Sequence, residues 1–84
     1  MSREENRKKV IAFLNSISIA DKKLSFENED VNLISGGYLD SLSVLSIINF
    51  LESEFNVNFS KISFNRNEIN SVGGILNLID RNPD

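Results

Sequence analysis

The chain has 84 residues, 40% of them hydrophobic, and a net charge of −3. These values fit one globular domain over residues 1–84 and argue against a disordered chain. The sequence contains no Cys and no His, which excludes disulfides, thiolate metal sites and catalysis by Ser-His-Asp or Cys-His groups. No apolar run reaches the roughly 18 residues of a membrane span, and no secretory signal is present, so we expect no membrane span and a cytoplasmic protein.

Charge is distributed unevenly along the chain. The first 23 positions hold six of the nine basic residues, which are Arg3, Arg7, Lys8, Lys9, Lys22 and Lys23. The stretch from Leu24 to Ser60 has no Lys or Arg and carries six acidic residues, which are Glu27, Glu29, Asp30, Asp40, Glu52 and Glu54. An acidic field of this kind repels nucleic acid. It suits a partner with a basic patch, or it is a plain solvated surface.

A first amphipathic helix is predicted from about Arg3 to Ser18. Ser2 and Glu5 have the spacing of a capping box at its start. The apolar residues recur at intervals of three and four and form one stripe, made of Val10, Ile11, Phe13, Leu14 and Ile17. The basic residues of this helix are interpreted as a solvated face.

A long connection follows over residues 19–37. Its scattered apolar residues predict that it is ordered and held against the core rather than free. A short helical turn is possible near Glu29 to Ile34. Gly36-Gly37 then allows a sharp change of direction.

The most apolar helix is predicted from Ser41 to Phe55, with Asp40 as its N-cap. An inward stripe is formed by Val44, Ile47, Ile48, Leu51 and Phe55. Leu42 and Leu45 fall off this stripe, so they are either ordinary core residues or a second apolar patch offered to a partner.

The last third of the chain predicts an extended connection over residues 56–59 and a short helical turn near Asn67 to Ile69. A final helix from Ser71 to Ile79 is capped by Ser71 and weakened by Gly73-Gly74. Five phenylalanines are predicted to lie in the core, namely Phe13, Phe50, Phe55, Phe59 and Phe64. The sequence as a whole predicts a small all-α domain of three main helices plus a short helix, with a long ordered loop after the first helix.

The residues that point to chemistry are Gly37-Tyr38-Leu39-Asp40-Ser41-Leu42. If Asp40 caps the helix, Ser41 lies at the surface in the first turn, beside backbone N–H groups that have no partner within the helix. A helix N-terminus favours an anion, so a phosphodiester on Ser41 is well tolerated there.

This segment resembles the phosphopantetheine attachment site of the acyl carrier protein family, whose hallmark is Asp-Ser-Leu. The resemblance covers nearly the whole chain and includes Leu51-Glu52-Ser53-Glu54-Phe55, residues 56–59, and Ile69-Asn70-Ser71-Val72 with Ile75. It implies an acyl-carrier-like bundle, a monomer, and a covalent 4′-phosphopantetheine on Ser41 delivered from coenzyme A by a phosphopantetheinyl transferase. The arm's thiol then carries an acyl or aminoacyl group as a thioester, for example in fatty acid or secondary metabolite biosynthesis, and the chain itself is not an enzyme.

Family partners dock on acidic and apolar residues around the second helix, which here implies Asp40, Leu42, Leu45, Glu52 and Glu54. The implied partners are a loading ligase and downstream acyltransferases or synthases. Typical fatty-acid carriers are acidic in the first two turns of this helix, whereas this chain has Ser43, Ser46 and then Asn49.

Alternatives remain open. Residues 62–67 and Tyr38-Leu39-Asp40-Ser41 also resemble D-alanyl and other aminoacyl carriers, which implies loading by a dedicated adenylating ligase. A helical adaptor without a cofactor is a second alternative. A free-standing hydrolase or transferase is disfavoured because His and Cys are both missing.

Overall fold

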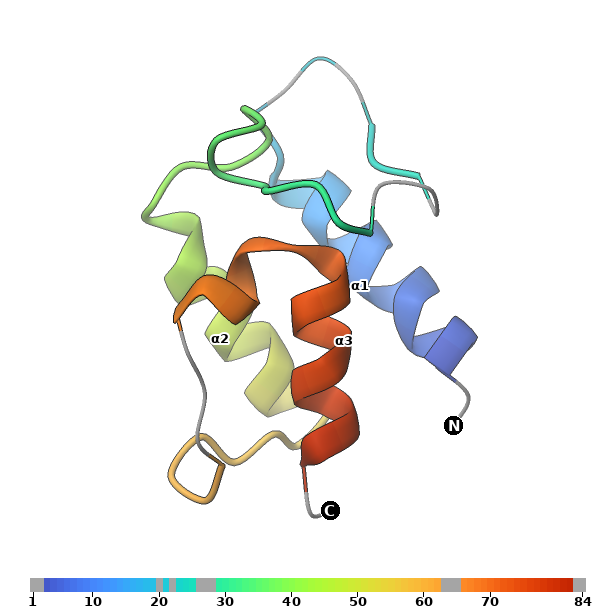
Figure 1. Ribbon diagram of the computed structural model, residues 1–84, viewed down its shortest axis with the longest axis vertical. Helices are drawn as coiled ribbons and strands as arrows, with labels where there is room; N and C mark the ends of the chain where they lie inside the picture. The colour runs from blue at the N-terminus through green and yellow to red at the C-terminus, as the bar shows by residue number, and fades with distance from the viewer. Residues whose placement is uncertain (1–2, 20, 22, 26–28, 63–65, 83–84) are drawn as a thin grey trace.

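The computed structural model describes residues 3–19, 21, 23–25, 29–62 and 66–82. In these ranges the chain forms α1 (Arg3–Ile17), α2 (Ser43–Glu54), the 3₁₀ helix η2 (Arg66–Asn70) and α3 (Val72–Arg81), and no strand. The prediction of an all-α domain with three main helices plus a short helix is confirmed (Figure 1). None of these helices combines the length and apolar character needed to cross a membrane.

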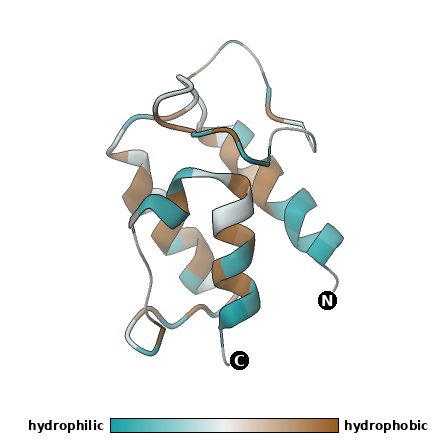
Figure 2. Ribbon diagram, in the orientation of Figure 1, coloured by the Kyte–Doolittle hydropathy of each residue, from teal (hydrophilic) through white to brown (hydrophobic). Residues whose placement is uncertain are grey.

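The helices surround one core. Figure 2 shows hydrophobic and hydrophilic residues alternating around α2 and α3, as expected for helices with one buried face. The core residues come from every helix and from the long loop, and they are Val10, Ile11, Leu14, Leu24, Leu33, Tyr38, Leu39, Val44, Ile47, Leu51, Phe55, Val57, Ile69, Val72, Ile75, Leu76 and Leu78.

The phenylalanines differ in part from their prediction. Phe55 is buried, whereas Phe13, Phe50 and Phe59 are half-buried and pack against the edge of the core. The Phe13 and Phe50 rings stack at 4.1 Å between centroids and thereby join α1 to α2. Phe64 lies outside the described residues.

The helix ends have specific stop and start signals. Asn56, at φ 56°, follows α2 in the left-handed conformation, and the Val57 N–H donates to the Leu51 carbonyl at 3.1 Å. A residue in the left-handed conformation directly after the C-cap is a common way for a helix to end. Ser71 caps α3 as predicted, because its Oγ accepts from the Gly74 N–H at 3.1 Å. The predicted capping box at Ser2 lies outside the described residues.

The structure gives a packing reason for Gly74. A Cβ at this position would lie 2.0 Å from the Glu68 carbonyl oxygen of η2. Only glycine allows η2 and the first turn of α3 to approach this closely. Gly74 lowers helix propensity, as predicted, and it also makes room for the close contact between α3 and the Glu68 carbonyl of η2.

The long loop between α1 and α2 is anchored at several points, as predicted. The Ile19 N–H donates to the Tyr38 carbonyl at 2.9 Å, and the Gly73 N–H donates to the Glu29 carbonyl at 2.9 Å. Figure 1 shows the loop passing over one end of the bundle. No helix forms near Glu29 to Ile34: residues 29–30 and 33–37 lie in turns, and residues 31 and 32 are irregular.

Ion pairs connect α1 to the loop and to the other helices. Arg3 and Arg7 each pair with Glu29 at 3.3 Å, and Arg3 also pairs with Asp80. Lys9 pairs with Glu54 at 3.5 Å. Lys8 and Lys9 are exposed, in line with the interpretation of a solvated face, whereas Arg3 and Arg7 are partly buried. Tertiary folding nevertheless brings acidic groups next to Arg3, Arg7 and Lys9.

Candidate functional site

The segment Gly37–Leu42 is positioned by a tight set of backbone bonds. Gly37 has a φ of +85°, a conformation that glycine adopts without strain. The N–H groups of Tyr38 and Leu39 both donate to the Leu33 carbonyl at 3.0 Å, and both side chains are buried. The two residues thus fix the backbone immediately before Asp40.

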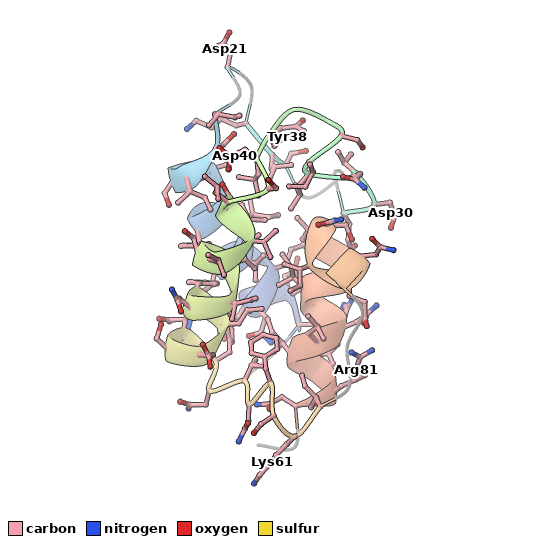
Figure 3. The ribbon with its side chains drawn as sticks, turned by 90° about the vertical axis from the view of Figure 1, so that its left-hand side faces the viewer. Asp21, Asp30, Tyr38, Asp40, Lys61 and Arg81 are labelled. Atoms are coloured by element: carbon pink, nitrogen blue, oxygen red, sulfur yellow. The ribbon has the colours of Figure 1, made fainter. Side chains whose placement is uncertain are left out.

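Asp40 and Ser41 lie at the entrance to α2. Both residues are exposed, and Figure 3 places Asp40 at the end of α2 that lies near Tyr38. The regular helix begins at Ser43, two residues later than predicted, with Leu42 in the cap position. Asp40 nevertheless acts as a cap, because its Oδ1 accepts from the Ser43 N–H, three residues on, at 3.1 Å.

The start of α2 leaves hydrogen-bond donors available next to Ser41. Among the described residues, no acceptor pairs with the backbone N–H of Ser41 or of Leu42. The Ser41 hydroxyl is likewise uncommitted within that part of the chain. An anion attached to Ser41 would therefore meet free N–H groups and the positive end of the α2 dipole.

A pocket of about 250 Å³ adjoins this serine. It lies between the long loop, the start of α2 and the end of η2, and its lining residues are Asn32, Ile34, Ser35, Ser41, Val44 and Asn70. Reasoning from the sequence identified Ser41 but missed Asn32, Ser35 and Asn70. No spacing in the sequence links these three residues, since they come together only through the loop and η2.

Leu42 and Leu45 are exposed on α2, by 76% and 65%. Both lie off the buried stripe, as predicted, and close to Ser41 in the sequence. The first turn of α2 has no acidic residue. The surface beside Ser41 on this helix is therefore apolar and uncharged, with Asp40 as the nearest carboxylate in the sequence.

Glu52 and Glu54 are exposed but belong to the other end of α2. Ten residues separate Leu42 from Glu52, which corresponds to about 15 Å along a helix. Glu54 is also engaged by Lys9. The structure therefore groups Asp40, Leu42 and Leu45 around Ser41 and leaves the two glutamates apart from them.

In the part of the chain that the structure describes, no group of three or more Asp or Glu residues is arranged to hold a metal ion.

A scan against protein-family models gives no match, and neither does a search of curated proteins or of solved structures.

Proposed function

We propose that this chain is a carrier protein that bears 4′-phosphopantetheine on Ser41 and presents acyl or aminoacyl groups as thioesters to partner enzymes. The observation that carries the proposal is the position of Ser41. Its hydroxyl is exposed and uncommitted among the described residues, and it lies beside two free N–H groups at the start of α2. The resemblance of Gly37–Leu42 to the acyl carrier attachment site supports the same function.

The attachment step is a phosphoryl-type transfer from coenzyme A. The Ser41 Oγ attacks the phosphorus that bears the pantetheine arm, and the bond from this phosphorus to the bridging diphosphate oxygen breaks. Adenosine 3′,5′-bisphosphate leaves, and the hydroxyl proton passes to a base of the phosphopantetheinyl transferase. The chain contributes an accessible nucleophile and donors for the new phosphodiester, while the transferase contributes catalysis.

The composition of the chain suits a carrier. Without Cys or His, the reactive thiol comes from the arm, and catalysis comes from the enzymes that load and unload it. A flexible tether raises the local concentration of the thioester at each partner's active site. The exposed Leu42 and Leu45 supply an apolar contact surface next to the attachment point.

The test is modification followed by intact-mass measurement. The chain is incubated with coenzyme A, Mg²⁺ and a broad-specificity phosphopantetheinyl transferase, beside Ser41→Ala and the matched variant Ser43→Ala. We expect one phosphopantetheine adduct on the wild type and on Ser43→Ala, and none on Ser41→Ala. An adduct on Ser41→Ala, or none on a folded wild type while a known carrier is modified in parallel, contradicts the proposal.

A second candidate is an adaptor that needs no cofactor. The exposure of Leu42 and Leu45 favours it independently of Ser41, since two neighbouring exposed leucines are a contact surface in their own right. The Ser41→Ala variant separates the two functions in the parent organism. An adaptor keeps its function in this variant, whereas a carrier loses it.

A further inference from the structure

A second pocket lies at the other end of α2 from Ser41. It has a volume of about 360 Å³, and its lining residues include Asn6, Glu54, Phe55, Ile79, Asp80 and Asn82. They come from the first half of α1 and from the C-terminal ends of α2 and α3. Figure 1 shows α2 and α3 running to the same end of the bundle. We call this space the Asn6 pocket, and the proposed carrier function does not use it.

Asn6 is a buried polar residue on the wall of this pocket. Only 6% of it is exposed, and it continues the spacing of the buried Val10 and Leu14 on α1. Its Oδ1 has no hydrogen-bond partner, and its amide nitrogen has none among the described residues. A buried amide without partners destabilises a protein, and Asn disfavours the interior of a helix. A side chain that breaks these rules without compensation indicates a role other than packing.

The Asn6 pocket also presents carboxylate oxygens that the protein does not use. Asp80 pairs with Arg3 through Oδ2, and Glu54 pairs with Lys9 through Oε1. The other oxygen of each carboxylate has no partner in the part of the chain that the structure describes. The last carbonyl groups of α2 and α3 add to these acceptors, because the final turn of a helix leaves them unpaired and carries the negative end of the dipole.

The walls of the pocket favour a flat cation with several N–H donors. Lys61 and Arg81 lie at this end of the bundle (Figure 3), but neither lines the pocket, and Arg81 pairs with Glu68 at 2.7 Å. The walls also include the apolar side chains of Phe55 and Ile79. A guanidinium group suits both kinds of surface, because it is planar, weakly hydrated and able to donate to several acceptors at once. An ammonium group is a compact and strongly hydrated charge.

We propose that the Asn6 pocket binds a guanidinium group, which donates to the unused carboxylate oxygens of Glu54 and Asp80 and to the Oδ1 of Asn6. The Asn6 amide turns toward the ligand about χ2, a torsion with a broad and roughly two-fold profile. The inference depends neither on Ser41 nor on the carrier function. The guanidinium belongs either to a free small molecule or to an arginine of a partner protein, and the test distinguishes these sources.

The test uses probes that separate charge from donor geometry. The isotopically labelled chain is titrated at constant ionic strength with methylguanidinium, tetramethylammonium or urea, each far below the concentrations that unfold proteins. Methylguanidinium has both the charge and the planar donors, tetramethylammonium has only the charge, and urea has planar donors without charge. We expect a saturable shift of the Asn6 side-chain amide signals in NMR spectra with methylguanidinium, and no saturable shift with the other two.

A fourth probe, N-acetylarginine amide, identifies the source of the guanidinium. Tighter binding of this compound than of methylguanidinium supports an arginine of a partner protein, because groups of the peptide then contribute. Equal or weaker binding supports a free small molecule. Either result keeps the guanidinium site.

Variants link the binding to particular side chains. Asn6→Leu continues the apolar stripe of α1, so it should raise the temperature of thermal unfolding and abolish the methylguanidinium shift, read from the backbone N–H signal of Phe55. Glu54→Gln removes one exposed charge and should weaken binding by about two- to fivefold. The matched variant Glu52→Gln, at an exposed position of α2 outside the pocket, should bind as the wild type does.

Several outcomes overturn the inference. One is a pocket that holds water only, in which methylguanidinium gives no saturable shift. Another is saturable binding of tetramethylammonium or urea as tight as that of methylguanidinium. An Asn6→Leu chain that still binds, or that is less stable than the wild type, also contradicts it, as does equal binding by Glu54→Gln and Glu52→Gln. Phosphopantetheine transfer to Ser41 is measured separately, so this inference and the carrier function fail independently.

Discussion

The Asp40 carboxylate holds Ser43 through two hydrogen bonds. Its Oδ1 accepts from both the backbone N–H and the hydroxyl of Ser43, each at 3.1 Å. Ser41 lies between these two residues and is therefore presented on a short turn that is closed by its own neighbours. The backbone bond from the Ser43 N–H to the Asp40 carbonyl, at 3.1 Å, closes the same turn around Ser41, the proposed attachment point.

Replacing Asp40 by Ala should destabilise the protein and slow modification of Ser41. Loss of a helix cap costs about 1 kcal/mol. The turn that presents Ser41 loses both side-chain bonds and keeps the backbone bond from the Ser43 N–H to the Asp40 carbonyl. Urea unfolding measures the first effect, and the rate of phosphopantetheine transfer measures the second. Asp40→Asn keeps an acceptor without the charge, so it should retain the stability. If Asp40→Ala keeps the wild-type stability and the wild-type rate of phosphopantetheine transfer, the carboxylate neither stabilises the fold nor assists the modification of Ser41.

Leu45→Ala should slow Ser41 modification while leaving the fold intact. The side chain is 65% exposed, so we expect the free energy of unfolding to change by no more than about 0.5 kcal/mol. The matched variant Leu51→Ala removes a side chain with no exposed surface and should cost about 2–5 kcal/mol. Transferase kinetics and urea unfolding are measured on both. An unchanged KM in Leu45→Ala would contradict a role for this leucine in docking.

Glu29→Gln should weaken the attachment of the long loop to α1. Glu29 pairs with both Arg3 and Arg7 at 3.3 Å, and all three side chains are partly exposed, so the loss should be about 0.5–1 kcal/mol. The effect should also shrink at high salt, because salt screens exposed pairs. Glu4→Gln is the control, since Glu4 is exposed and has no ion-pair partner among the described residues. Equal stability changes in the two variants at low salt would refute the prediction.

Gly74→Ala should destabilise the protein although alanine favours helix. The added Cβ would lie 2.0 Å from the Glu68 carbonyl oxygen, and overpacking of this kind costs about 1–3 kcal/mol. Gly73→Ala is the comparison, because its Cβ would lie 3.1 Å from the Glu29 Cγ and 3.3 Å from the Glu29 carbonyl oxygen, which is a much smaller overlap. Thermal unfolding should therefore show a larger loss for Gly74→Ala, and the reverse order would be evidence against the close contact.

The helices were predictable from sequence because their signals are local. The buried residues Val44, Ile47 and Leu51 recur at helical spacing within one short segment, so the segment alone predicts the helix. Ser71 caps α3 through a bond to Gly74, only three residues away. The helix bounds differed by one or two residues because the ends depend on turns, as at Ser41 and Leu42.

The pocket beside Ser41 was not predictable in the same way. Its residues Asn32 and Asn70 are brought together by the bond between the Leu33 N–H and the Asn70 carbonyl, which joins segments far apart in the chain. The same holds for Glu29, whose partners Arg3, Arg7 and Gly73 lie in α1 and α3. Long-range contacts of irregular segments have no periodic signal. The motif therefore predicts a role for Ser41 from sequence alone, whereas the residues around Ser41 are seen only in the structure.

Thiol titration tests the carrier function most directly, because the sequence has no cysteine and any thiol must come from the arm. The chain is treated with coenzyme A and a phosphopantetheinyl transferase, purified from small molecules, and reacted with a thiol reagent under denaturing conditions. The account predicts one thiol per chain for the wild type and none for Ser41→Ala. A wild type that stays free of thiol, while a known carrier gains one in the same reaction, would contradict it.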